Sequence, residues 1–275
     1  MPLTLTVKQR RWLCVAFCFC LTFFLIAAYR KQELKAKARV FRYPSTLDRH
    51  INHDQHSTES KSNSTTFEAI ARKHGTNKVT SHRYQFMYEK YLGPLQGKPI
   101  KFLEIGLGCN MNYGPGASYN TWLEFLPGVD LYFIDNDRIC AETFKHNNPN
   151  ARIAIGDQAS VQFLNQFANE STRDGLFDVI VDDGGHGMLE QITSLEQLWK
   201  IVNPGGLYVI EDLQTSYREH WGGDSSGRDT RKHTTMKYVY GLLDDMMAGW
   251  TKHSISRSLE SVDCMAEICV FRKTT

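Results

Sequence analysis

Two short apolar runs that end in acidic residues constrain the fold of this 275-residue chain more than any other feature. The runs are residues 177–181 and 206–210, and each has the β-branched and aromatic content of a buried strand. A helix and a return loop fit between them, so a right-handed crossover would place the two strands parallel in one sheet. We therefore expect their carboxyl ends to face one crevice. The polar residues that follow the two runs are Asp182, Asp183, His186, Glu211 and Asp212.

Carboxylates gathered at one crevice repel one another unless a positive charge offsets them. A divalent cation with oxygen ligands is the obvious candidate. A histidine that merely ties down its own loop is the simpler interpretation of His186, but its position beside two acids at a strand end favours a functional role. Glu211 and Asp212 could instead cap the next segment, yet their position opposite Asp183 favours a metal site. We interpret Asp182 as structural.

The rest of the chain from Ile100 onward alternates strand-like and helix-like segments. Strands are predicted at residues 100–105, 130–135, 151–155, 177–181 and 206–210, with helical segments between them. This alternation predicts an α/β fold with a doubly wound, mostly parallel Rossmann-like sheet. Residues 254–259 and 266–272 are predicted to be two closing strands. The polar residues 214–235, rich in Gly and Ser, are predicted to form a functional loop such as a lid over a site, with His220, His233, Tyr217 and Arg228 as weak candidates for acceptor contacts.

The N-terminal residues predict a membrane anchor. Residues 1–11 are a short basic tail. Residues 12–29 carry no charge and could span roughly 27 Å as a helix, which makes them the predicted transmembrane anchor. Residues 30–65 are predicted to be a basic juxtamembrane segment and a polar stem, which precede the globular domain of residues 66–275. A cleaved signal peptide is the weaker alternative. The sequons at Asn63 and Asn169 favour a luminal orientation, although the charges leave the side open. We predict a single-pass membrane protein of the endoplasmic reticulum or Golgi with a luminal catalytic domain.

Charge and cysteine content exclude some classes of protein. The first 45 residues carry nine Lys or Arg and one acid, so the remaining residues have a net charge of −6 within a total of +2. A nucleic-acid-binding surface is therefore not indicated. The cysteines lack the paired C-x-x-C spacing of a zinc site. One disulfide is conceivable, joining Cys264 to Cys269 or to Cys140. The sequence leaves open whether the chain forms a homo-oligomer.

A glycine-containing loop follows the first predicted strand and indicates a nucleotide-like cofactor. Gly106 and Gly108 would let the backbone approach a ligand closely. Glu104, before the first glycine, would repel a pyrophosphate but suits an amino group such as that of S-adenosylmethionine. Asp135 ends the second strand, where an acid can accept both ribose hydroxyls. Asp157 and Gln158 end the third strand, where adenine would lie.

The stretch from about Gly75 to Leu213 resembles the metal-dependent sugar O-methyltransferases of macrolide and tetracenomycin-type antibiotic biosynthesis, and the related cephalosporin hydroxylase-like group. The motifs that carry the resemblance are Gly75-Thr-Asn-Lys78 with His82-Arg-Tyr84, Glu104-Ile-Gly106, Ala117-Ser118 with Trp122, Ile134-Asp135, Gly156-Asp157-Gln158, Asp182-Asp183-Gly-Gly-His186, and Pro204-Gly-Gly with Glu211-Asp212-Leu213. The loop of residues 109–116 and the N-terminal anchor depart from the family pattern.

The resemblance implies a class I methyltransferase fold, S-adenosylmethionine as cofactor and a divalent ion, usually Mg²⁺. It implies that Asp183, Glu211 and Asp212 hold the ion and that His186 is the general base, and it adds Ser118 to the cofactor residues. The predicted function is therefore a membrane-anchored O-methyltransferase that acts on a sugar or glycan hydroxyl. Two alternatives remain at this point: a methyltransferase of a catechol-like diol, and a degenerate methyltransferase fold that serves as a binding module.

Overall fold

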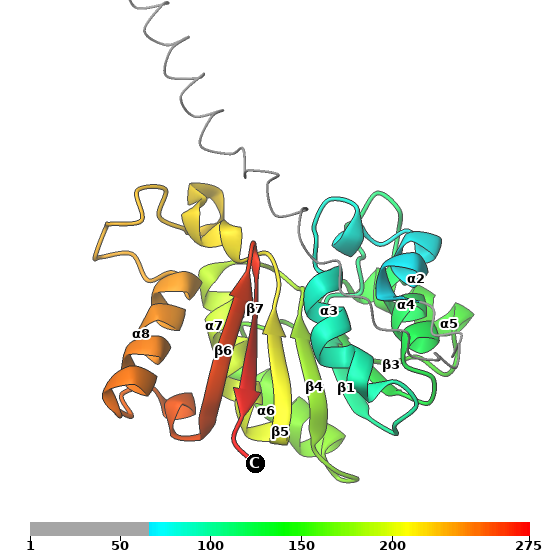
Figure 1. Cartoon of the computed structure of the whole chain (residues 1–275). Helices are drawn as coiled ribbons and strands as arrows, with labels where there is room; N and C mark the ends of the chain where they lie inside the picture. The colour runs from blue at the N-terminus through cyan, green and yellow to red at the C-terminus, as the bar shows by residue number, and fades with distance from the viewer. Residues whose placement is uncertain (1–65) are drawn as a thin grey trace, which may run out of the picture. The chain divides into compact units, whose positions relative to one another are not determined.

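The computed structural model describes residues 66–275, which form a seven-stranded sheet with helices on both faces (Figure 1). The strands are β1 (Lys101–Ile105), β2 (Asp130–Asp135), β3 (Arg152–Ile155), β4 (Phe177–Asp182), β5 (Val202–Ile210), β6 (Leu259–Met265) and β7 (Ile268–Lys273). The α-helices are α2 (Phe67–His74), α3 (Gln85–Leu92), α4 (Ala117–Phe125), α5 (Arg138–Asn147), α6 (Val161–Ser171), α7 (Met188–Leu198) and α8 (Thr235–Ala248). Short 3₁₀ helices connect them: η1 (Asn77–Val79), η2 (Gly93–Leu95), η3 (Trp199–Ile201), η4 (Leu213–Tyr217), η5 (Glu219–Trp221) and η6 (Ser254–Ser258).

The first five strands are parallel, as the alternating pattern predicts. The strand order is β3-β2-β1-β4-β5-β7-β6, so the chain reverses its winding direction between β1 and β4. Ligands of open α/β sheets bind at such a reversal, outside the carboxyl ends of the strands. The hairpin of β6 and β7 adds two antiparallel strands next to β5. The α/β class and the doubly wound sheet are therefore confirmed.

Alternating side chains along the strands divide the core into two layers. Phe102 on β1 faces a cluster with Phe67 of α2 and Trp122 of α4, while its neighbour Leu103 faces a cluster with Leu164 of α6 and Leu195 of α7. Because successive side chains of a strand point to opposite faces, buried apolar residues at both positions require cover on both sides. In Figure 1, α3 and α4 cover one side of the sheet, and α6 and α7 cover the other.

Two predictions about local structure are wrong. The segment 254–259 was expected to be a strand, but η6 occupies it and β6 starts only at Leu259. The segment 214–235 was predicted to be a loop, but it contains the short helices η4 and η5 and several hydrogen bonds between side chains and backbone. In the second segment, local hydrogen bonds such as the one from the Arg228 amide to Ser226 favour turns over extended backbone. In the first segment, Ser256 and Ser258 bond to Asp245 and Trp199.

The predicted anchor, stem and basic tail, including Asn63, lie outside the described residues. Asn169 lies exposed on α6. The longest described helix, α8, has 14 residues, so it is about 21 Å long and shorter than the roughly 30 Å core of a bilayer. Within residues 66–275 we find no helix whose length and apolar character would let it cross a membrane.

Candidate active site

A cavity of about 410 Å³ lies at the carboxyl ends of the parallel strands, where the winding direction reverses. This volume suits a cofactor-sized molecule. Its walls come from the loop after β1, the tips of β2 and β3, the loop after β4, the tip of β5 and η5. The predicted site residues among its lining are Gly106, Gly108, Ser118, Asp135, Gln158, Asp183, His186 and Asp212.

The loop after β1 passes close to the tip of β4. Gly106 has a φ of +99°, and a Cβ atom there would lie 2.1 Å from the backbone oxygen of Asp183. Only glycine fits this position, because any side chain would push the two strand tips apart. Asp135 fastens the next residue of the loop: one carboxylate oxygen accepts a hydrogen bond from the Leu107 amide and the other from the Asp137 amide, both at 2.8 Å. The first glycine and the acid of β2 thus shape one wall of the cavity.

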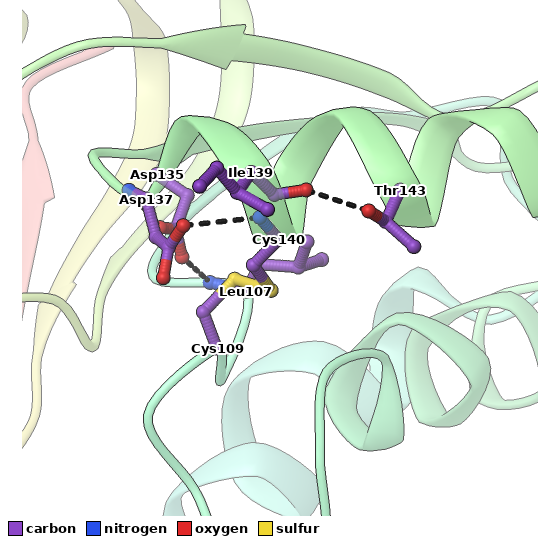
Figure 2. The surroundings of a disulfide bond; sticks show 7 residues. All are labelled: Leu107, Cys109, Asp135, Asp137, Ile139, Cys140 and Thr143. Carbon is purple, nitrogen blue, oxygen red and sulfur yellow. Dashed lines mark hydrogen bonds between the residues drawn. A yellow bond between two sulfur atoms is a disulfide. The ribbon is translucent and has the colours of Figure 1, made fainter.

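A disulfide joins this loop to the helix after β2. Figure 2 shows Cys109 of the loop bonded to Cys140 in the first turn of α5, beside the hydrogen bond from the Leu107 amide to Asp135. Cys109 also lines the cavity. The sequence did not point to this pair, whereas the Cys264–Cys269 bond is one of the two alternatives it suggested and is confirmed. The other alternative, Cys140 with Cys264, is wrong because Cys140 is already bonded.

Asp183, His186 and Asp212 converge on the opposite side of the cavity. The Nε2 atom of His186 lies 3.3 Å from Oδ2 of Asp212 and 3.9 Å from Oδ1 of Asp183. One potential ligand atom from each residue lies within 4.8 Å of the other two. Both His186 and Asp212 have a φ of +56°, a conformation that non-glycine residues adopt at a cost and that is often found at functional sites. The structure therefore brings together three of the four residues expected to serve the metal and the base.

Lys78, to which sequence reasoning assigned no role, provides a positive charge inside the acidic cluster. Its side chain is 1% exposed, and its Nζ lies 2.6 Å from Asp183, 2.7 Å from Glu211 and 3.1 Å from Glu104. Burial lowers the pKa of Lys78, but the three carboxylates outweigh burial and hold that pKa well above its usual value. Lys78 is thus a charged ammonium that partly offsets the acids. Its membership of the motif from Gly75 to Lys78 was the available signal.

Glu211 and Glu104 lie behind the cavity wall rather than in it. The carboxylate of Glu211 is 1% exposed and accepts hydrogen bonds from Lys78 and from the hydroxyl of Tyr88. Burial raises the pKa of Glu211 well above the usual range, and the charge of Asp183 raises it further. Glu104 accepts a hydrogen bond of 2.8 Å from the indole of Trp122, and burial also raises its pKa. Neither side chain lines the cavity in this arrangement.

Asp212 is held by residues from the segment between α2 and α3. The Tyr84 hydroxyl lies 3.2 Å from both the Oδ1 atom and the amide nitrogen of Asp212. His82 stacks on Tyr84, places its Nε2 atom 3.6 Å from Asp212 and pairs through Nδ1 with Glu267 at 2.8 Å. Burial raises the pKa of Asp212, but the interaction with the nearby His186 ring and the hydrogen bond from Gln214 outweigh burial and lower this pKa. Asp212 is therefore ionised and oriented.

The remaining predicted residues have structural neighbours. Gln158 donates to Asp182 at 3.0 Å and accepts from the Gly185 amide at 2.8 Å, so it connects the tips of β3 and β4 while lining the cavity. Asp182 is fully buried and also accepts a hydrogen bond from Ser194, in agreement with its structural interpretation. Asp157 is exposed, caps its own turn through the Ala159 amide and does not line the cavity.

The described residues fit both a divalent cation and a nucleoside-type cofactor. Asp183 and Asp212 offer carboxylate oxygens to the cavity, which are suitable ligands for Mg²⁺. The Nδ1 atom of His186 is buried without a hydrogen-bond partner, so the ring is not fixed by its own loop. The glycine loop and Asp135 form a separate wall where the backbone lies open to a ligand.

No family model matches the chain. The chain is 29% identical over 178 residues to the 8-demethyl-8-alpha-L-rhamnosyl tetracenomycin-C 2'-O-methyltransferase of Streptomyces olivaceus, a match that covers 64% of the chain and 44% of that relative. It is 31% identical over 166 residues to the mycinamicin VI 2''-O-methyltransferase of Micromonospora griseorubida, covering 59% of the chain and 39% of the relative. The chain thus spans less than half the length of these curated relatives.

A solved structure shares the fold. The MycE methyltransferase of the mycinamycin biosynthetic pathway, in complex with Mg, SAH and mycinamycin VI, superposes with a TM-score of 0.66 at 26% sequence identity. The match covers 76% of this chain and 55% of MycE. It therefore includes most of the described residues.

The predicted location is corrected by these findings. None of the described helices could cross a bilayer, and the relatives are methyltransferases of bacterial antibiotic pathways. The prediction of a single-pass protein of the endoplasmic reticulum or Golgi with a luminal domain is therefore wrong. In sequence and in structure the chain is similar to the antibiotic sugar O-methyltransferases, and its fold is that of the class I S-adenosylmethionine-dependent methyltransferases.

Proposed function

We propose that the protein is an S-adenosylmethionine- and Mg²⁺-dependent O-methyltransferase that acts on a hydroxyl of a sugar-bearing acceptor. One observation carries the proposal: a single cavity is lined on one side by the glycine loop and Asp135, and on the other by Asp183, His186 and Asp212. A methyl donor held at the first wall and a hydroxyl held at the second would share one enclosed space. The relative named as an O-methyltransferase of a rhamnosyl tetracenomycin-C supports this choice of acceptor.

The cofactor would lie against the tips of β1–β3. Gly106 and Gly108 leave the backbone accessible, and Asp135 retains lone pairs that can accept ribose hydroxyls in addition to its two amide hydrogen bonds. Ser118, the second residue of α4, lies at the same wall, and Gln158 lies there in the loop after β3. Glu104 would not reach the amino group directly, because it lies behind the cavity wall and pairs with Lys78 and Trp122. Asp157 would support the loop after β3 through its hydrogen bond with the Ala159 amide, without contacting the cofactor.

The cation would be held by Asp183 and Asp212, with Glu211 behind them. When bound, the cation makes a coordinated hydroxyl more acidic and S-adenosylmethionine supplies an activated methyl group. The residues of the chain orient and balance these groups. Lys78 neutralises part of the charge of Asp183 and Glu211 before any cation enters, which limits their repulsion. Tyr84 and His82 fix the carboxylate of Asp212 toward the cavity.

His186 would take the proton from the acceptor hydroxyl. Its Nε2 atom faces the cavity side of Asp212, whose negative charge would stabilise the imidazolium that forms. The Nδ1 atom has no hydrogen-bond partner among the described residues, so Nε2 is the ring nitrogen that meets the carboxylates. The same geometry also allows His186 to be a third metal ligand, so the experiment must separate the two roles.

The first test is binding and transfer. We expect the purified protein to bind S-adenosylhomocysteine by calorimetry, and to methylate methyl α-L-rhamnopyranoside when Mg²⁺ is present but not after chelation. Catechol, tested in parallel, would be the better acceptor if the diol alternative holds. No binding of the cofactor product or of Mg²⁺ under any condition would instead support a degenerate binding module.

The second test is His186→Ala, with the exposed lid residue His233→Ala as a matched control. A general base typically contributes 10²–10⁴-fold, so we expect a loss of about that size in turnover. Mn²⁺ affinity, followed by electron paramagnetic resonance, should change little if His186 is a base. A large loss of Mn²⁺ affinity would make it a ligand, and full turnover would remove it from the chemistry.

A further inference from the structure

Trp221 is the residue of the lid (residues 214–235) that reaches the cavity. It ends η5 and lines the cavity together with Asp183, His186 and Asp212. The centres of the Trp221 and His186 rings are 5.8 Å apart, and the ring planes are 73° apart. The planes of the His220 and Trp221 rings are 81° apart, so neither histidine stacks flat on the indole. His220, Tyr217, His233 and Arg228, which the sequence suggested as weak candidates, are exposed and do not line the cavity.

The lid holds Trp221 in place through hydrogen bonds that continue into α8. Asp224 is 2% exposed. Its carboxylate accepts a hydrogen bond of 2.8 Å from the Asp229 amide and forms an ion pair of 2.7 Å with Lys237 of α8. Lys232 donates to the backbone oxygen of Gly223 at 2.9 Å. A Cβ atom on Gly223 would lie 2.3 Å from the backbone oxygen of Thr215, so the lid packs closely on η4. Trp221 therefore projects from an ordered segment, as a binding residue requires.

The mechanism leaves Trp221 unused although it adjoins the proposed base. A sugar ring has an apolar C–H face and a polar hydroxyl edge. The polar groups of this side of the cavity, Asp183, His186 and Asp212, can meet the hydroxyl edge, but they offer nothing to the C–H face. An indole supplies a large apolar surface at low cost in conformational entropy.

We propose that Trp221 is the wall against which the ring of a sugar acceptor packs, so that the hydroxyl edge of that ring faces His186 and the two carboxylates. This inference rests on the proposed sugar O-methyltransferase function and deepens it. Trp221 sets the substrate class: it selects cyclic acceptors with an apolar face over open-chain diols that could reach the same carboxylates. It takes no part in cofactor binding, because the glycine loop and Asp135 form a different wall.

The test compares Trp221→Ala, Trp221→Phe and the control Trp250→Ala in the full chain with Mg²⁺ present. Trp250 is 49% exposed and does not line the cavity. For methyl α-L-rhamnopyranoside we expect Trp221→Ala to raise KM about tenfold, the size of a lost aromatic packing contact. Its kcat at saturation should stay within about threefold of wild type, because no proton-transfer group is removed. Trp221→Phe should recover most of the affinity.

Two further readouts separate binding from a loss of lid structure. The affinity for S-adenosylhomocysteine should stay within about twofold in all variants, and KM for propane-1,2-diol, which has no ring, should not change in Trp221→Ala. The proposal is overturned if Trp221→Ala behaves like Trp250→Ala, or if KM rises equally for the ring and the open-chain diol. If the wild-type protein methylates neither acceptor, the proposed function is refuted, and the proposed role of Trp221 is refuted with it.

Discussion

The two sides of the cavity are held in place by different kinds of interaction. On the cofactor side, backbone hydrogen bonds to Asp135 and the Cys109–Cys140 bond fix the loop after β1. On the acidic side, a buried ammonium, Lys78, holds the tips of β4 and β5 through their carboxylates. The comparison shows that a wall with a single carboxylate can be held by backbone hydrogen bonds and a covalent link, whereas a wall of several like charges needs a counter-charge even before its ligand arrives.

Backbone strain is concentrated on the acidic side. The non-glycine residues with positive φ among residues 66–275 are His186, Asp212 and Glu267. Two of them line the cavity, and the third pairs with His82 beside Asp212. Glycines take the positive φ angles of the cofactor side. Strain at non-glycine residues persists only when the surroundings over-determine it. The ion pairs of Lys78 and the hydrogen bonds of Tyr84 supply such surroundings on the acidic side.

The largest effect should come from removing the counter-charge. Lys78→Met leaves Glu104, Asp183 and Glu211 without their cation, and breaking a buried ion pair from one side costs about 3–5 kcal/mol. We expect this loss in the free energy of unfolding measured with urea. Mg²⁺ should restore part of it, since the ion supplies the missing charge. The control is Lys73→Met, whose exposed pair with Glu124 should contribute far less, because solvent screens it. Equal losses in both variants would contradict the comparison.

The second prediction tests the disulfide between Cys109 and Cys140. Changing Cys109 and Cys140 together to Ser opens a loop of 31 residues, which corresponds to roughly 3.7 kcal/mol in the chain-entropy model. The affinity for S-adenosylhomocysteine should fall by about tenfold, because the loop must then be ordered on binding. The double change at Cys264 and Cys269 is the control: its five-residue separation predicts roughly 2 kcal/mol and no change in that affinity. An unchanged affinity in the first variant would show that the loop needs no covalent support.

The sequence predicted the strand tips better than it predicted their partners. Buried parallel strands are apolar runs that end sharply, so the sequence alone predicts that Asp135, Asp183 and Asp212 lie at one edge of the sheet. Lys78 could not be placed, because it lies 105 residues before Asp183 in a short 3₁₀ helix with no periodic pattern. The positive charge between the acids was therefore attributed to a metal ion alone, whereas Lys78 supplies part of it.

Cysteine pairing and side-chain direction are also hard to predict from the sequence. The Cys264–Cys269 pair spans a hairpin turn and is local, whereas Cys109 and Cys140 meet only because β1 and β2 are neighbours. Glu211 and Asp212 are adjacent in sequence, yet one points to Lys78 and the other lines the cavity. Such directions depend on φ, and the left-handed conformation of Asp212 has no reliable signal in the identity of the residue.

A smaller effect should follow from Tyr84→Phe, which leaves the charges of the acidic side in place but removes the hydroxyl that bridges Asp212. The buried amide and carboxylate of Asp212 would lose a partner, which costs about 1–2 kcal/mol in the free energy of unfolding. Mn²⁺ affinity should fall a few-fold, because Asp212 would no longer be held toward the cavity. Tyr91→Phe is the control, since its hydroxyl binds Asp263 outside the cavity lining and its loss should leave Mn²⁺ affinity unchanged.

The last prediction concerns acid stability, and it is needed to assign any pH effect to the acidic side. Burial raises the pKa of Asp245 on α8, but hydrogen bonds from the amide and ring of His253 and from Ser256 outweigh it and bring that pKa down to about 2. Because the folded-state pKa lies below the usual value of about 3.8, the unfolded chain binds the proton first as the pH falls. The stabilisation is therefore complete above about pH 4 and is lost toward pH 2.

Asp245→Asn should accordingly lower the melting temperature at pH 7, and the difference from wild type should close between about pH 4 and pH 2. Asp244→Asn, at the exposed neighbouring position, should show no such difference at either pH. A gap that persists at pH 2 would mean that packing rather than charge holds Asp245. Once this contribution is subtracted, acid loss that remains in wild type but is absent in Lys78→Met can be attributed to the strand tips, because only there would the ion pairs with Lys78 have been removed.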